Sequence, residues 1–193
     1  PTYLMTHPAV DDRIAYLDAW MDRHPDAPKL PDRDETFRRV KMRLIAGYGE
    51  PERALREMTE RFDAAPEDPV IQHGYGIALA RNDRNAEAIE FVRKALAQRP
   101  LDPILLKDMG EINFMGGHYE AARDALTGSL GIGPADYEAL YLLGRTDIEL
   151  ERYDEAVRTL ERLLEQRPNF RPALYQLGQA YGRKNQLGDA HYY

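Results

Sequence analysis

Cysteine is absent from this chain of 193 residues, which excludes disulfide bonds and thiol catalysis. No run of about 18 apolar residues occurs, so no segment is predicted to span a membrane as a helix. Basic residues are outnumbered, because 26 lysines and arginines face 33 aspartates and glutamates, for a net charge of −7. A nucleic-acid partner is not expected, since phosphate binding requires a basic surface.

Sequence motifs for catalysis and cofactor binding are missing as well. The chain contains no HExxH motif, phosphate-binding loop, nucleophile elbow or dinucleotide fingerprint. The histidines have no metal-binding spacing to one another or to acidic residues; they are His7, His24, His73, His118 and His191. We therefore predict no catalytic residue, no metal site and no cofactor within these residues.

A strict repeat of 34 residues is present instead. Small residues and prolines return at this spacing in three series, which are Ala54, Ala88, Ala122, Ala156, Ala190; Gly76, Gly110, Gly144, Gly178; and Pro66, Pro100, Pro134, Pro168. Because a repeat of this length indicates stacked supersecondary units, the series predict an array of identical helix pairs.

The period and its small residues resemble the tetratricopeptide repeat (TPR) family from Glu35 onward. The resemblance implies an all-α fold, a right-handed α-solenoid of antiparallel helix pairs that occupies residues 31–193. Four complete units are predicted at 35–68, 69–102, 103–136 and 137–170, followed by a truncated fifth unit at 171–193.

Each unit is expected to contain a helix A and a helix B that approach closely at their small residues. In the third unit, helix A is predicted at 104–115 and helix B at 119–130, with the turn at Gly116-Gly117. Gly110 and Ala122 allow the close approach, and Pro134 ends the unit.

The first unit departs from this pattern, as terminal repeats commonly do. Met42 takes the glycine position, and an apolar stripe at helical spacing is formed by Phe37, Val40, Leu44 and Tyr48. We interpret four basic residues as a solvated face paired with acidic residues close by in sequence; they are Arg38, Arg39, Lys41 and Arg43.

The fifth unit stops soon after its helix B begins at Asp189. Because a natural solenoid ends in a polar cap, we predict that the chain continues past Tyr193. The raw end is expected either to fray or to pair with another copy, which would give self-association.

Residues 1–30 precede the repeats and are predicted to form one helix and a linker. Ile14, Leu17, Trp20 and Met21 recur at helical spacing, and prolines at 25, 28 and 31 follow. One interpretation is a capping helix on the repeat stack. The other is the tail of an upstream domain, because Thr6-His7-Pro8 followed by Arg13-Ile14 resembles the end of the catalytic domain in HtpX-like zinc metallopeptidases of the BepA type.

This second resemblance implies that the chain is the TPR region of a periplasmic HExxH metallopeptidase whose zinc ligands lie upstream. In that family the repeats engage client proteins and the outer-membrane assembly machinery. His7 would then approach the zinc of the upstream domain, where it would occupy the position of the catalytic water. The alternative for His7, which we favour, is a structural or exposed histidine before a proline. The alternative is a free-standing TPR scaffold or co-chaperone-like adaptor without a protease, which would be cytoplasmic.

Under either interpretation the repeats are a module that binds protein or peptide ligands and not an enzyme. Outward positions of the A helices predict a concave groove of residue types common at interfaces: Arg39, Arg43, His73, Ile77, Arg81, Lys107, Glu111, Phe114, Tyr141, Arg145, Tyr175, Gln179 and Arg183. The alternative interpretation is that these positions are solvated helix faces without a partner. A clamp for C-terminal carboxylates of chaperones is not expected, because its asparagines are missing and Glu111 would repel a carboxylate.

Asn113 and Asp147 occupy a helix A position that is apolar or aromatic in other units. We interpret them as side chains that hydrogen-bond into an adjacent helix or remain partly exposed, with a specificity point in the groove as the alternative.

Overall fold

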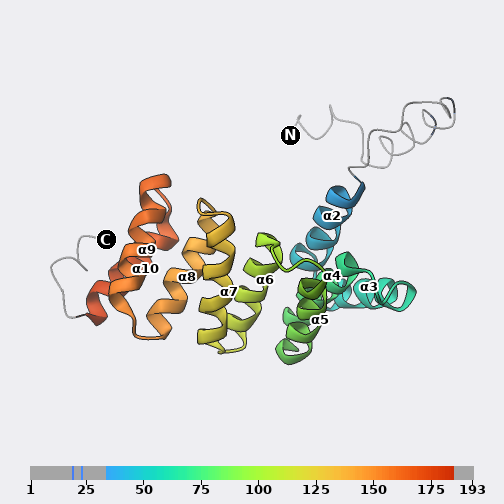
Figure 1. Cartoon of the computed structure of the whole chain (residues 1–193), viewed down its shortest axis with the longest axis horizontal. Helices are drawn as coiled ribbons and strands as arrows, with labels where there is room; N and C mark the ends of the chain where they lie inside the picture. Colours follow the sequence, from blue (N-terminus) through green and yellow to red (C-terminus); the bar gives the residue numbers. More distant parts are fainter. Residues whose placement is uncertain (1–18, 20–22, 24–33, 185–193) are drawn as a thin grey trace, which may run out of the picture. The chain divides into compact units, whose positions relative to one another are not determined.

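The computed structural model describes residues 19, 23 and 34–184 (Figure 1). Residues Arg38–Tyr193 form one compact unit and Pro1–Phe37 another. The predictions for the helix of residues 1–30, for His7 and for helix B of the fifth unit lie outside the described residues.

Over residues 34–184 the secondary structure is helical, with no strand. The helices are α2 (Asp34–Tyr48), α3 (Pro51–Ala64), α4 (Pro69–Ala80), α5 (Asn85–Gln98), α6 (Pro103–Met115), α7 (Tyr119–Ile132), α8 (Tyr137–Glu149), α9 (Tyr153–Gln166) and α10 (Arg171–Arg183). The even-numbered helices are the predicted A helices and α3, α5, α7 and α9 the B helices. These helices confirm the all-α prediction for the described residues. From α3 onward each helix packs on the next in chain order (Figure 1). No helix in this part of the chain has the length and apolarity needed to cross a membrane.

Acidic side chains fix where three of the A helices begin. Asp68, Asp102 and Asp136 stand immediately before α4, α6 and α8, and each accepts hydrogen bonds from backbone N–H groups of the first turn. These N–H groups have no partner within the helix, so the aspartate caps stabilise it. Pro69 and Pro103 then occupy the first turn, where a missing N–H costs nothing.

The turn between helices A and B requires one residue with left-handed backbone geometry. Gly117 has φ +76°, and the positions one repeat away, Asp83 and Glu151, have φ 61° and 58°. Only glycine adopts this conformation without a steric cost, yet the chain repeats it with other residues. The turn geometry is therefore set by the stacking of the repeats and not by glycine alone.

The repeated glycines bring each helix A against its helix B. A Cβ atom added to Gly110 would lie 2.5 Å from Cγ of Leu126, and at Gly144 it would lie 2.7 Å from Cγ of Leu160. Ala122, Leu126 and Leu160 have no exposed surface. The missing side chain thus makes room for a leucine of the partner helix, which couples helix spacing to core packing.

Gly110→Ala is therefore expected to destabilise the fold, although alanine is the better helix former. Overpacking against Leu126 should cost about 1–3 kcal/mol, which exceeds the gain of about 1 kcal/mol in helix propensity. Gly128→Ala is the matched control, because its Cβ would meet only Leu106 at 3.7 Å. Urea unfolding should show a loss for the first variant and a gain for the second; a gain for both would contradict the packing.

The first helix pair follows the same plan with a different contact. Met42 of α2 is buried and packs against Met58 and the backbone of Gly74. The apolar stripe predicted on α2 is present but stays outside the core, since Phe37, Val40, Leu44 and Tyr48 are 65%, 52%, 52% and 82% exposed. One helix of the array consequently presents an apolar face to solvent.

Candidate functional site

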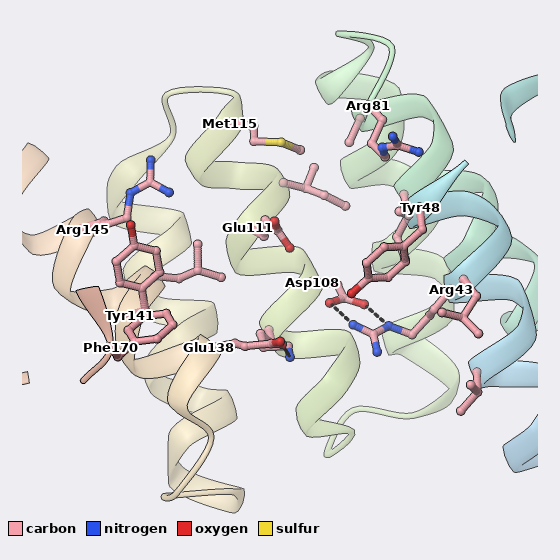
Figure 2. A pocket seen from close by; sticks show the side chains of 18 residues that line it. Arg43, Tyr48, Arg81, Asp108, Glu111, Met115, Glu138, Tyr141, Arg145 and Phe170 are labelled. Carbon is pink, nitrogen blue, oxygen red and sulfur yellow. Dashed lines mark hydrogen bonds and ion pairs between the residues drawn. The ribbon is translucent and has the colours of Figure 1, made fainter. Parts of the chain in front are cut away.

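A groove with a volume of about 650 Å³ is lined by side chains of the A helices α2, α4, α6 and α8, and by Phe170 ahead of α10 (Figure 2). It brings together seven of the thirteen residues predicted for the groove, which are Arg43, Ile77, Arg81, Lys107, Glu111, Tyr141 and Arg145. That these residues contact a partner stays a prediction.

The other six predicted residues lie outside this groove: Arg39, His73, Phe114, Tyr175, Gln179 and Arg183. His73 is buried beneath it, and Phe114 lies under the guanidinium of Arg145. Arg39 forms an ion pair with Asp102 beside a separate hollow. The last three are on α10, where Gln179 donates a hydrogen bond of 3.0 Å to the hydroxyl of Tyr175.

Among the groove residues that sequence reasoning missed, two groups decide the chemistry of the groove. The first is the apolar wall of Val40, Leu44 and Tyr48 on α2. Their spacing of four residues predicts one helix face, but it does not show whether this face points to the core or to the groove. The second is the pair of carboxylates Asp108 and Glu138. The sequence does mark Asp108 as unusual, because the equivalent positions one repeat before and after it hold the nonpolar residues Gly74 and Leu142. A carboxylate at a buried position of a repeat requires a partner from elsewhere.

That partner is Arg43, which crosses from α2 to α6. Its Nε and Nη2 atoms donate to the two carboxylate oxygens of Asp108 at 2.9 and 3.0 Å (Figure 2). Nε2 of His73 lies 2.7 Å from Oδ2 of the same carboxylate. Two parallel N–H···O bonds fix the geometry as well as the charge. The network therefore ties the A helices of the first three units together.

The charge state of Asp108 follows from these contacts. Burial raises the pKa of the carboxyl, but the hydrogen bond and charge of His73 and the guanidinium of Arg43 outweigh burial and hold the pKa below its ordinary value. Asp108 is therefore ionised at neutral pH, and the imidazole donates the hydrogen bond.

Two further basic residues of α2 also form ion pairs with aspartates that lie later in the chain. Arg38 pairs with Asp68, and Arg39 pairs with Asp102. The predicted salt-paired face is present, but its partners are not close by in sequence, because they come from the starts of α4 and α6. The aspartates that cap these helices also hold α2 against them.

A second ion pair lies beside the groove floor. The ammonium of Lys107 donates to Glu138 and lies 3.5 Å from Asp136, while only 8% of its side chain is exposed. Burial lowers the pKa of Lys107, but the hydrogen bond that its ammonium donates to Glu138 and the charge of Asp136 raise the pKa above the ordinary value. Lys107 thus stays charged and is committed to internal partners.

Aromatic rings and guanidinium groups form one continuous wall. Arg145 lies over the rings of Phe114 and Tyr141, at 4.5 and 5.6 Å from the ring centroids. Tyr141 meets Phe170 edge-on at 5.5 Å, and Phe170 meets Tyr137 at 5.9 Å. These contacts hold the wall in one arrangement before any partner arrives.

The two polar residues at apolar helix A positions are both buried. Asp147 accepts a hydrogen bond of 2.8 Å from Arg123 on the adjacent helix α7, as expected. Asn113 instead donates to the carbonyl of Met109 in its own helix. Neither residue lines the groove. Over the described residues, no three acidic or histidine side chains gather in a metal-binding group.

Asp108→Asn is expected to lower the free energy of unfolding by about 2–3 kcal/mol at neutral pH, because Arg43 loses the charge of its largely buried partner. A depressed folded-state pKa means that the stabilisation exists above the ordinary carboxyl pKa and is lost as pH falls through the folded-state value. The difference between wild type and variant should thus shrink below about pH 4. Urea unfolding at neutral and acidic pH measures both effects.

Glu90→Gln provides the matched control, because Glu90 pairs with Arg93 on the surface and both side chains are more than half exposed. Exposed pairs contribute little to stability. If the two variants were equally stable at neutral pH, the Arg43–Asp108 network would not be a determinant of the fold.

Two family models, both described as tetratricopeptide repeat, match residues 48–103 and 114–190. Together they cover more than half of the chain, and the structure repeats one helix pair along it. The class defined by fold and groove is a protein-binding α-solenoid, and the chain belongs to the tetratricopeptide repeat proteins.

Individual relatives are similar over different lengths. The MamA 41-end structure from Desulfovibrio magneticus RS-1 has a TM-score of 0.69 and 25% identity, covering 85% of this chain and 92% of that one. The peroxisomal targeting signal receptor of Kluyveromyces lactis is 24% identical over 76% of this chain and 25% of its own length. The rhomboid protease GluP of Bacillus subtilis is 31% identical over 42% of this chain and 16% of its own. The chain thus spans a quarter or less of the curated relatives it matches.

Proposed function

We propose that the groove of the A helices binds a segment of a partner protein. The observation that supports this most directly is the exposed apolar wall of Val40, Leu44 and Tyr48, which lines the groove and belongs to none of the core clusters of the described residues. Large apolar side chains gathered on a concave surface are typical of protein-binding sites.

The opposite wall supports the same function. Tyr141, Arg145 and Phe170 are residue types that contribute most of the binding energy at protein interfaces. Their stacked contacts fix these side chains before a partner binds. Binding would therefore cost little of their conformational entropy. One wall is apolar and adaptable, and the other is rigid and amphipathic.

A pair of matched double variants tests the location of the site. Tyr48→Ala/Arg145→Ala removes one side chain from each wall, and Ile132→Ala/Arg158→Ala removes a large apolar side chain and an arginine from exposed positions on the B helices α7 and α9, outside the groove. Partners captured by the immobilised wild-type chain from an extract of its own cells should be lost with the first variant and kept with the second. Equal recovery with all three proteins would exclude this groove.

The proposed context is a periplasmic zinc metallopeptidase in which the repeats deliver client proteins to an upstream catalytic domain. Its support is the Thr6-His7-Pro8 and Arg13-Ile14 resemblance, and the fact that one curated relative, a rhomboid protease, also combines a protease with a matching segment. Tethering a client beside a protease raises its local concentration there. Zinc would be held upstream, with His7 near it, and outer-membrane assembly proteins would be the clients.

The coding sequence upstream of Pro1 tests this context. An HExxH motif and an export signal are expected there, and His7→Ala in the full-length protein should change zinc affinity and proteolysis. A start codon directly before Pro1 would contradict it.

The second candidate is a free-standing TPR scaffold. Its support is the similarity to MamA 41-end, because the alignment covers 92% of that chain. The groove would then gather partners without processing them, and a captured partner would remain intact.

A further inference from the structure

The charged side chains that line the groove differ in whether they have partners. Direct contacts within the protein occupy all but one of them: Arg43 with Asp108, Lys107 with Glu138, Arg81 with the carbonyl of Ala46, and Arg145 with the ring of Phe114. Glu111 is the exception, since no hydrogen bond or ion pair joins it to any residue in the described chain.

Glu111 occupies a central position in the groove. It extends from α6 between Tyr141 of the rigid wall and Tyr48 of the apolar wall (Figure 2). Burial and the negative charges of Asp108 and Glu138 raise the pKa of its carboxyl. The cations Lys107 and Arg43 lower it, but both are bound to other carboxylates.

This arrangement restricts what can occupy the groove. The side chain of Glu111 is exposed to the water of the groove. A segment that covers Glu111 would remove this water, and a carboxylate buried without a partner is strongly unfavourable. Neutral and acidic segments would therefore be rejected. A segment that brings its own cation would instead form a partly desolvated ion pair, which is stronger than one on the open surface.

The other two arginines of the groove, beside the Asp108-bound Arg43, impose no comparable requirement. Arg81 already donates a hydrogen bond of 2.9 Å to the backbone carbonyl of Ala46, and Arg145 is stacked on aromatic rings. A guanidinium is more weakly hydrated than a carboxylate or ammonium, so covering these groups costs less. The unpaired carboxylate is thus the dominant charge that a partner must match.

We infer that the partner segment presents a lysine or arginine to Glu111, with apolar residues beside it against Leu44 and Tyr48. This inference rests on the proposed function of the groove and adds the chemistry that selects the partner. Glu111 acts as the specificity-determining residue of the groove.

Selection of short random peptides displayed on phage tests this inference. Peptides that bind the wild-type chain should be enriched in lysine or arginine at one position flanked by apolar residues. Glu111→Gln should lower the affinity for a selected peptide about tenfold or more, because the desolvated ion pair is lost. A peptide whose basic residue is replaced by glutamate should no longer bind the wild-type protein. The same peptide should bind the Glu111→Lys variant, in which the two charges are exchanged.

Three results would overturn the inference. Peptides without a basic preference, or with equal affinity for wild type and Glu111→Gln, would show that Glu111 does not select the partner while leaving the groove as the site. Peptides that bind Tyr48→Ala/Arg145→Ala as tightly as wild type would exclude the groove itself and hence the proposed function. A wild-type dimer that Glu111→Lys dissociates would place a second copy of the chain in the groove.

The variants should remain folded, which separates a binding effect from unfolding. Because the folded state raises the pKa of Glu111, its charge is unfavourable at neutral pH and the cost disappears below the unfolded carboxyl pKa. Glu111→Gln should therefore melt at the same temperature as wild type or higher. Glu149→Gln, an exposed glutamate of α8 outside the groove, is the matched control and should leave peptide affinity unchanged.

Discussion

The close approach of each helix A to its helix B is the constraint on which the array depends. Gly76, Gly110 and Gly144 leave space that Val92, Leu126 and Leu160 of the partner helices fill. Since the B-helix leucines are fully buried there, the contact fixes both the spacing of the pair and its rotation. The remaining face of helix A is left for other contacts, and the groove forms along that face.

Within the groove, stability and recognition use different residues. Charged side chains that face one another across units are paired, as in Arg43 with Asp108 and Lys107 with Glu138, and these pairs hold neighbouring A helices in register. The exposed apolar face of α2 and the unpaired Glu111 contribute nothing comparable to the fold. Local departures from favourable folding chemistry of this kind are expected at functional sites. They are the features on which we base the proposed function and the partner chemistry.

The helices, their order and the turn at Gly116-Gly117 were predictable from sequence, because the repeat period places the same small residues and breakers at the same points of every unit. Of the seven predicted residues that line the groove, six lie on α4, α6 and α8. Periodicity identifies the outward face of helix A. It does not show which outward side chains are used internally, as His73 and Phe114 are, or that the groove ends before the residues of α10.

The sequence by itself determined the repeat, the helix pairs and their spacing, since these depend on contacts between residues at a constant separation. Only the tertiary structure decided the charge pairing, because Arg39 and Arg43 reach partners 63 and 65 residues away, the cap of α6 and a residue within α6. It also decided that the apolar stripe of α2 faces solvent, since the same helical period fits a buried and an exposed face equally well. The lack of an ion-pair or hydrogen-bond partner for Glu111 among the described residues belongs to the same category, because only their arrangement in space shows which side chains lie within reach.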